Sequence, residues 1–127
     1  MSVVHPATTD STDAENGIDD RDRRALLEAL LCERTAPGMF RVYNEEGTDY
    51  VVDIDGGACT CPDFRYRAVE CKHLRRARLE AGDADTAALA ERVDAGIEAV
   101  DNRLEALATQ RTALVRLKGA LDRFDRQ

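Results

Sequence analysis

Residues 59–73 have the sequence CTCPDFRYRAVECKH, and they hold three of the four cysteines and one of the two histidines of this 127-residue chain. The stretch contains two ligand pairs, Cys59 with Cys61 and Cys71 with His73, and one residue separates the members of each pair. In an extended chain the side chains at i and i+2 point the same way, so the two members of a pair can reach one ion. The spacing therefore predicts one metal site with these four ligands.

Three thiolates and one imidazole are a typical ligand set for tetrahedral zinc. Four protein ligands leave no coordination position for water or substrate, so the sequence predicts one structural Zn²⁺ ion and not a catalytic one. In a regular helix, side chains at i and i+2 point about 200° apart. We therefore expect Cys71 and His73 to lie before, or just at the start of, a helix that continues through residues 74–79.

The segments before the cysteines suggest two further elements and a tail. Residues 39–43 and 50–54 alternate apolar and polar side chains around the turn sequence at residues 44–47, which predicts a β-hairpin. Leucines at helical spacing predict a short amphipathic helix at residues 19–35, which the Pro-Gly pair after it would close. Residues 1–18 are rich in Asp, Ser and Thr and are predicted to be a disordered acidic tail.

The last third of the chain, residues 83–126, is predicted to be a long helix or a helical hairpin. Its apolar stripe advances by threes and fours with a mean near the heptad value of 3.5, and Arg111 interrupts it. One interpretation is a coiled-coil homodimer through residues 85–124. The alternatives are a hairpin broken near residues 108–110 and a helix folded back onto its own domain. The stripe contains Leu89, Val93, Ile97, Val100, Leu104, Leu107, Arg111, Leu114, Leu117, Leu121 and Phe124.

Together these elements predict an α+β fold. Its centre is a small zinc-finger module of one β-hairpin and one helix at residues 39–81, between the short helix and the long, coiled-coil-like C-terminal helix.

The motifs CTCPDF at residues 59–64 and CKHL at residues 71–74, after a hairpin and before a helix, resemble the SWIM-type zinc finger. Cys59, Cys61, Cys71 and His73 match the four ligands of that family, and the resemblance covers about residues 39–81. It implies a β-β-α layout and a role in binding DNA or protein. The acidic, lysine-poor composition is similar to that of small stand-alone SWIM proteins of haloarchaea.

Charge is distributed unevenly along the chain, whose net charge is −7. Residues 59–79 carry six cations and two anions, whereas the segments on both sides are acidic. Such a basic segment with an interleaved aromatic residue predicts a nucleic-acid surface. Its candidate residues are Arg65, Arg67, Lys72, Arg75, Arg76, Arg78 and Tyr66.

Two functions follow from these features. In the first, the finger binds DNA or acts within a DNA-associated complex through its basic surface. In the second, the protein is an adaptor whose helices bind protein partners and whose finger makes no direct nucleic-acid contact.

Other classes of function are excluded by features that the sequence lacks. It has neither a phosphate-binding loop nor a Ser/His/Asp set, so we expect neither enzyme activity nor a small-molecule substrate. Apolar runs of the 18 to 20 residues that span a membrane are missing, and the N-terminus lacks the pattern of a secretion signal. We therefore expect a cytoplasmic protein without a membrane partner.

Overall fold

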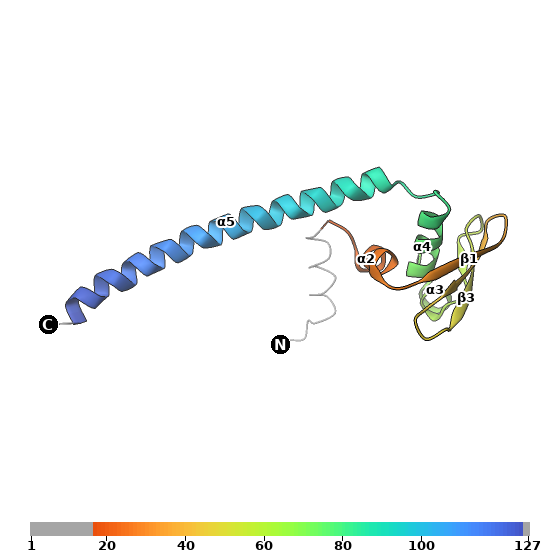
Figure 1. Ribbon diagram of the computed structural model, residues 1–127, viewed down its shortest axis with the longest axis horizontal. Helices are drawn as coiled ribbons and strands as arrows, with labels where there is room; N and C mark the ends of the chain where they lie inside the picture. The colour runs from red at the N-terminus through yellow and green to blue at the C-terminus, as the bar shows by residue number, and fades with distance from the viewer. Residues whose placement is uncertain (1–16, 126–127) are drawn as a thin grey trace.

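The computed structural model describes residues 17–125, so almost all of the predicted acidic tail lies outside the described residues. The chain folds into a small body of strands and short helices from which one long helix projects (Figure 1). This architecture confirms the α+β class. The elements are α2 (Asp20–Leu27), β1 (Leu31–Ala36), β2 (Met39–Tyr43), β3 (Asp49–Asp53), β4 (Ala58–Cys59), α3 (Pro62–Arg67), α4 (Lys72–Glu80) and α5 (Thr86–Asp125).

The four strands form one antiparallel sheet in the order β1-β2-β3-β4. The predicted hairpin is β2 with β3, in which Phe40 pairs with Val52 and Val42 with Tyr50. Its turn is closed by the Asn44 side chain, whose oxygen accepts the backbone N–H groups of Glu46 and Thr48. This alternation places Phe40, Val42 and Val52 on the buried face.

The predicted helix at residues 19–35 is wrong beyond Leu27. Asp19 caps α2 by accepting the backbone N–H of Asp22, but the chain is already extended at Glu28, and residues 31–36 form β1. Pro37 and Gly38 make the turn between β1 and β2, with Gly38 at φ +74°. Pairing with β2 decides this segment, because without β1 the hydrogen-bonding groups along that edge of β2 would lack backbone partners.

The core lies between the sheet and α4. Leu74 and Ala77 of α4 are buried in the same cluster as Val42 and Val52 of the sheet, and the three motif cysteines belong to this cluster. On its other side α4 packs against α2. The predicted metal ligands Cys59, Cys61 and Cys71 are therefore part of the hydrophobic core.

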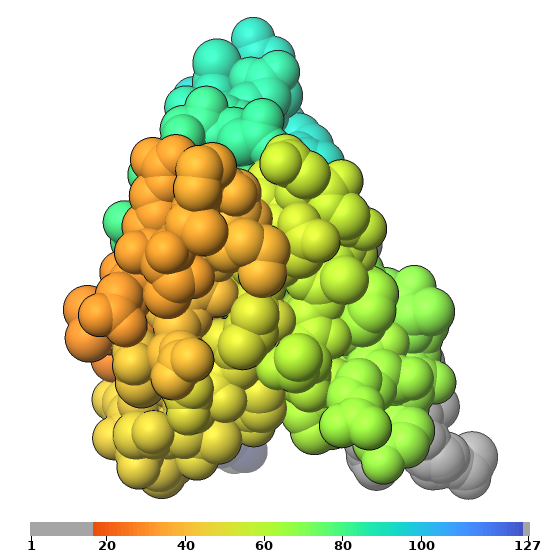
Figure 2. Space-filling view, turned by 90° about the vertical axis from the view of Figure 1, so that its right-hand side faces the viewer, coloured from red at the N-terminus to blue at the C-terminus, as the bar shows by residue number. Residues whose placement is uncertain are grey.

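The C-terminal segment is one continuous helix of 40 residues, α5, so the predicted hairpin with a break at residues 108–110 is wrong. Asp85 caps it, and its carboxylate accepts the backbone N–H of Ala88 at 3.0 Å. At about 1.5 Å per residue the helix is roughly 60 Å long. Viewed from the sheet end of the finger, α5 lies behind the body (Figure 2). Within residues 17–125, no helix is long and apolar enough to cross a membrane.

Candidate metal centre

The four predicted ligands come from three short elements that end or begin at the same place. Cys59 is the last residue of β4, Cys61 is the N-cap of α3, Cys71 is the N-cap of α4, and His73 lies in the first turn of α4. Cys61 and Cys71 have extended backbones, with ψ of 160° and 172°. The expectation that the second pair lies just at the start of its helix is therefore confirmed.

Helix α3 was not predicted, although it connects the two ligand pairs. Pro62 fills its first position, where no backbone N–H is needed, and the Cys61 sulfur accepts the backbone N–H of Phe64 at 3.5 Å. Ala68 ends the helix in the left-handed region at φ 53°, which turns the chain back toward Cys71. A residue able to cap, followed by Pro62 and the acidic Asp63, was the available signal for this helix.

The donor atoms of these four residues lie within 4.8 Å of one another, and all four side chains are buried. The Cys59 Sγ is 4.0 Å from the His73 Nδ1. A tetrahedral zinc with Zn–S bonds of about 2.3 Å separates its sulfurs by about 3.8 Å, so the cluster fits one zinc ion. The His73 ring is held on one side by Tyr50, with 4.7 Å between the ring centroids.

Residues 40–77 match the family model of the SWIM zinc finger. All four buried donors lie inside this matched segment. The chain contains a SWIM zinc finger. No match was found among curated proteins or among solved structures. The similarity to small haloarchaeal proteins stays a prediction.

The thiols of the SWIM finger influence one another's ionisation. A hydrogen bond from Cys59 lowers the pKa of Cys71 to about 4, whereas burial raises the pKa of Cys61. Negative charge therefore collects first at Cys71, which caps α4. The remaining thiols ionise favourably only beside a cation, so zinc binding releases protons and weakens as the pH falls.

The four cations that α4 contributes to the predicted nucleic-acid surface are engaged within the protein. Their side chains are only 19–27% exposed. Most of these ion pairs join α4 to α2, to the loop before α4 or to the linker after it. The pair of Arg76 lies within α4, but its guanidinium also donates to the backbone oxygens of Ala25 and Glu28. The pairs are Lys72 with Glu28, Arg75 with Asp19 and Asp22, Arg76 with Glu80, and Arg78 with Glu70 and Asp83.

The three candidates on α3 differ from those on α4. Arg67 pairs with Asp63 at 3.0 Å, whereas the side chain of Arg65 has no hydrogen-bond or ion-pair partner within residues 17–125. Tyr66 is 83% exposed. The structure therefore does not bring the seven predicted nucleic-acid residues together as one free basic surface.

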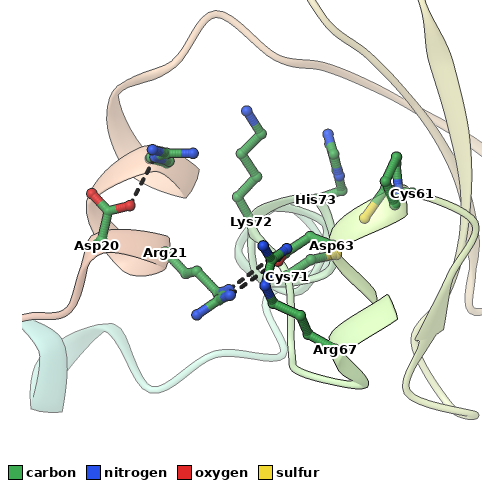
Figure 3. A pocket seen from close by; sticks show the side chains of 10 residues that line it. Asp20, Arg21, Cys61, Asp63, Arg67, Cys71, Lys72 and His73 are labelled. Atoms are coloured by element: carbon green, nitrogen blue, oxygen red, sulfur yellow. Dashed lines mark hydrogen bonds and ion pairs between the residues drawn. The ribbon is translucent and has the colours of Figure 1, made fainter. Parts of the chain in front are cut away.

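An ion pair that the sequence did not indicate closes one side of the SWIM finger. Arg21 reaches from α2 to both oxygens of Asp63 on α3, at 2.7 and 3.0 Å (Figure 3). This hydrogen bonding holds the pKa of Asp63 below its usual range. The pair lies at a hollow of about 560 Å³ that Cys71 and His73 also line. Helix α2 is therefore attached directly to the metal-binding part of the finger.

The largest effect of an ion-pair mutation is expected at Arg75, since it contacts two acids and is mostly buried. Arg75→Ala should lower the free energy of unfolding of the zinc-loaded protein by about 1 to 3 kcal/mol, because it leaves Asp22 without its charged hydrogen bond. Arg65→Ala is the matched control and should change it by less than about 0.5 kcal/mol. Chemical denaturation measures both. Equal effects of the two variants would contradict this assignment.

Proposed function

We propose that this protein is a protein–protein interaction module in which the zinc-bound SWIM finger presents α5 as the binding surface. The proposal rests on the apolar stripe of α5. From Asp101 to Asp125 every residue of the helix is exposed except the half-exposed Ala120. The large apolar side chains of this part, apart from Val115, are nevertheless leucines and a phenylalanine in heptad-like spacing. The residues with 58–69% exposure are Leu104, Leu107, Leu114, Leu117, Leu121 and Phe124.

An uncovered stripe of this kind favours association. Each leucine removed from water stabilises a complex by about 25 cal/mol per Å² of apolar surface. Most of the stability of a helix in a protein comes from packing its apolar face. A partner that covers the stripe would therefore stabilise both the helix and the complex.

The SWIM finger serves as the base to which the helix is attached. Only residues 81–85 separate α4 from α5, and Arg78 holds Asp83 of this linker at 3.1 Å. Farther along, Arg92 of α5 lies 3.8 Å from Asp22 of α2. These contacts restrain the first turns of α5, so that the stripe is presented away from the zinc-bound body.

Nucleic-acid binding is the second candidate, and Arg65 and Tyr66 favour it. An exposed tyrosine beside an arginine whose side chain has no partner among residues 17–125 is typical of surfaces that stack on single-stranded bases. The ion pairs of α4 limit such a surface to α3. The basic surface on α3 is smaller than the one that the sequence predicted. We therefore rank nucleic-acid binding second.

A capture experiment distinguishes the two functions. Tagged protein is incubated with a lysate of its own cells at the native salt concentration, with and without nuclease, and the bound proteins are identified. We expect the partner to remain bound after nuclease treatment and with the double variant Arg65→Ala/Tyr66→Ala. We expect it to be lost with Leu104→Asp/Leu114→Asp, because a buried carboxylate without a partner is strongly unfavourable. Loss on nuclease treatment, with retention by the Leu→Asp variant, would overturn the proposal in favour of nucleic acid.

A further inference from the structure

We infer that the partner of the α5 stripe is α5 of a second copy of this chain, aligned antiparallel. This inference rests on the proposed function and names the molecule that covers the stripe. Three independent features of α5 support it: its charge distribution, the phase of its apolar residues, and an apolar hollow near its start.

The two halves of α5 carry opposite charge. Residues 86–105 contain two cations and five anions, whereas residues 106–125 contain four cations and two anions. An antiparallel pair places the acidic half of each helix beside the basic half of the other. A parallel pair would place like charges together along the whole length, which is unfavourable. The charge pattern of the helix is therefore complementary to itself in one orientation.

The apolar stripe consists of two blocks with the same spacing. The first is Ile97, Val100, Leu104 and Leu107, the second is Leu114, Leu117, Leu121 and Phe124, and both advance by three, four and three residues. The steps of three, four and three are the same when read from either end of the helix. An antiparallel pair centred between residues 110 and 111 therefore places each residue of the first block opposite one of the second. The layers are Ile97 with Phe124, Val100 with Leu121, Leu104 with Leu117, and Leu107 with Leu114.

The residue that interrupts the stripe also favours this orientation. Arg111 lies between the two blocks, at a point where the heptad phase shifts. In a parallel dimer Arg111 would face the same arginine of the second copy. In the antiparallel dimer it faces Gln110, whose side-chain carbonyl can accept a hydrogen bond from the guanidinium.

An apolar hollow lies where the second helix would end. It has a volume of about 340 Å³, and Ile18, Val93, Gly96, Ile97 and Val100 contribute to its lining. The antiparallel register places Phe124 of the second copy opposite Ile97, at this hollow. An aromatic side chain there would cover the part of the stripe nearest to the finger.

The overall shape accommodates the second copy. Helix α5 projects from one side of the finger (Figure 1). In the antiparallel register, the start of α5 in one copy lies about 15 Å beyond Asp125 of the other. The two fingers then lie at opposite ends of the helical pair and do not collide.

The oligomeric state is tested by light scattering on the zinc-loaded full-length protein. We expect twice the chain mass of 14.0 kDa. Leu107→Asp should weaken the dimer at least about 30-fold, because the substitution enters two central layers at once. Thr109→Asp, which adds the same charge on the opposite face of the helix, should leave the dimer intact. Equal weakening by both variants would overturn the assignment of the stripe as the interface.

The orientation is tested by cross-linking two variants in a Cys32→Ser background with zinc bound. One chain carries Asp101→Cys and the other carries Lys118→Cys, and the reagent is a short bismaleimide. In the antiparallel register, position 101 of one chain and position 118 of the other lie within about 3 Å of each other along the axis. The same position in the two chains is separated by at least about 20 Å. We expect cross-linked dimers only in the mixture. The Cys32→Ser chain without an added cysteine should give none.

The outcomes separate this inference from the proposed function. Cross-linking of each variant to itself shows a parallel dimer, and overturns the inference while the interaction function stands. A monomer that still captures another protein through the stripe also overturns the inference, and the interaction function again stands. A monomer whose capture does not depend on the stripe overturns both.

Discussion

Removal of zinc should unfold the SWIM finger from β1 to α4. The ligands Cys59, Cys61 and Cys71 are three of the ten residues of the hydrophobic cluster, so the ion and the core form one unit. A domain of this size gains only about 3 to 5 kcal/mol from its core, whereas a structural zinc site supplies roughly 10 to 16 kcal/mol. Without the ion the balance therefore favours the unfolded chain.

Amide NMR of the protein before and after addition of a chelator measures this effect. We expect the dispersed amide signals of residues 31–80 to collapse, and to return when stoichiometric zinc is added back. Acidification should act in the same direction, because the ligand thiols bind protons as the ion leaves. A finger that keeps its dispersed spectrum after complete removal of metal would contradict the assignment.

The cysteines provide a matched pair of variants for the same question. Cys71→Ser removes a fully buried ligand and should abolish stoichiometric zinc binding, measured by elemental analysis. Cys32→Ser changes the remaining cysteine, which lies in β1 and belongs to no ligand pair, and should retain one zinc per chain. Retention of zinc by Cys71→Ser would show that these four residues are not the ligand set.

Leu74→Ala should be the most destabilising single change outside the ligands. The Leu74 side chain is 1% exposed, and it packs in the cluster between α4 and the sheet. Its truncation leaves a cavity that the surrounding side chains fill only in part, at a cost of about 2 to 5 kcal/mol. For a domain of this size, that is a large fraction of the total stability.

Leu27→Ala is the control for this substitution, because it removes the same atoms from a side chain that is 74% exposed. It should change the free energy of unfolding by no more than about 0.5 kcal/mol. Thermal denaturation of the zinc-loaded variants, followed by circular dichroism, compares the two. If Leu74→Ala melted at the temperature of Leu27→Ala, the core described between α4 and the sheet would be wrong.

The part of the fold that the sequence predicted correctly depends on local patterns. Two ligand pairs with one-residue spacing specify the metal site, and strict alternation at residues 39–43 and 50–54 specifies β2 and β3. Both signals arise within a few residues and need no knowledge of distant contacts. The continuous helix α5 is of the same kind, although the sequence left a hairpin open as well.

The elements β1 and α3 were not predicted, and for different reasons. The helical spacing of Leu26, Leu27, Leu30 and Leu31 suggested a helix that continues through residues 31–36, yet pairing with β2 makes this segment β1. The short helix α3 was missed because its start is set by Cys61, and the interpretation of that residue as an extended metal ligand concealed its role as a cap. For β1 a tertiary requirement overrides the local preference, whereas for α3 the local signal was present and only its metal-binding role was considered.

The sequence by itself determined the ligand set, the phase of the C-terminal stripe and the uneven charge. Only the tertiary structure decided what the cations of residues 72–78 do, since their acidic partners include Asp19, Asp22 and Glu28, about 50 positions earlier in the chain. Charge can be counted along a sequence, but its availability to a ligand depends on which opposite charges the fold brings within about 4 Å. For this finger, folding joins much of its basic segment to the acids Asp19, Asp22 and Glu28 in and beside α2. It leaves the second half of α5 exposed.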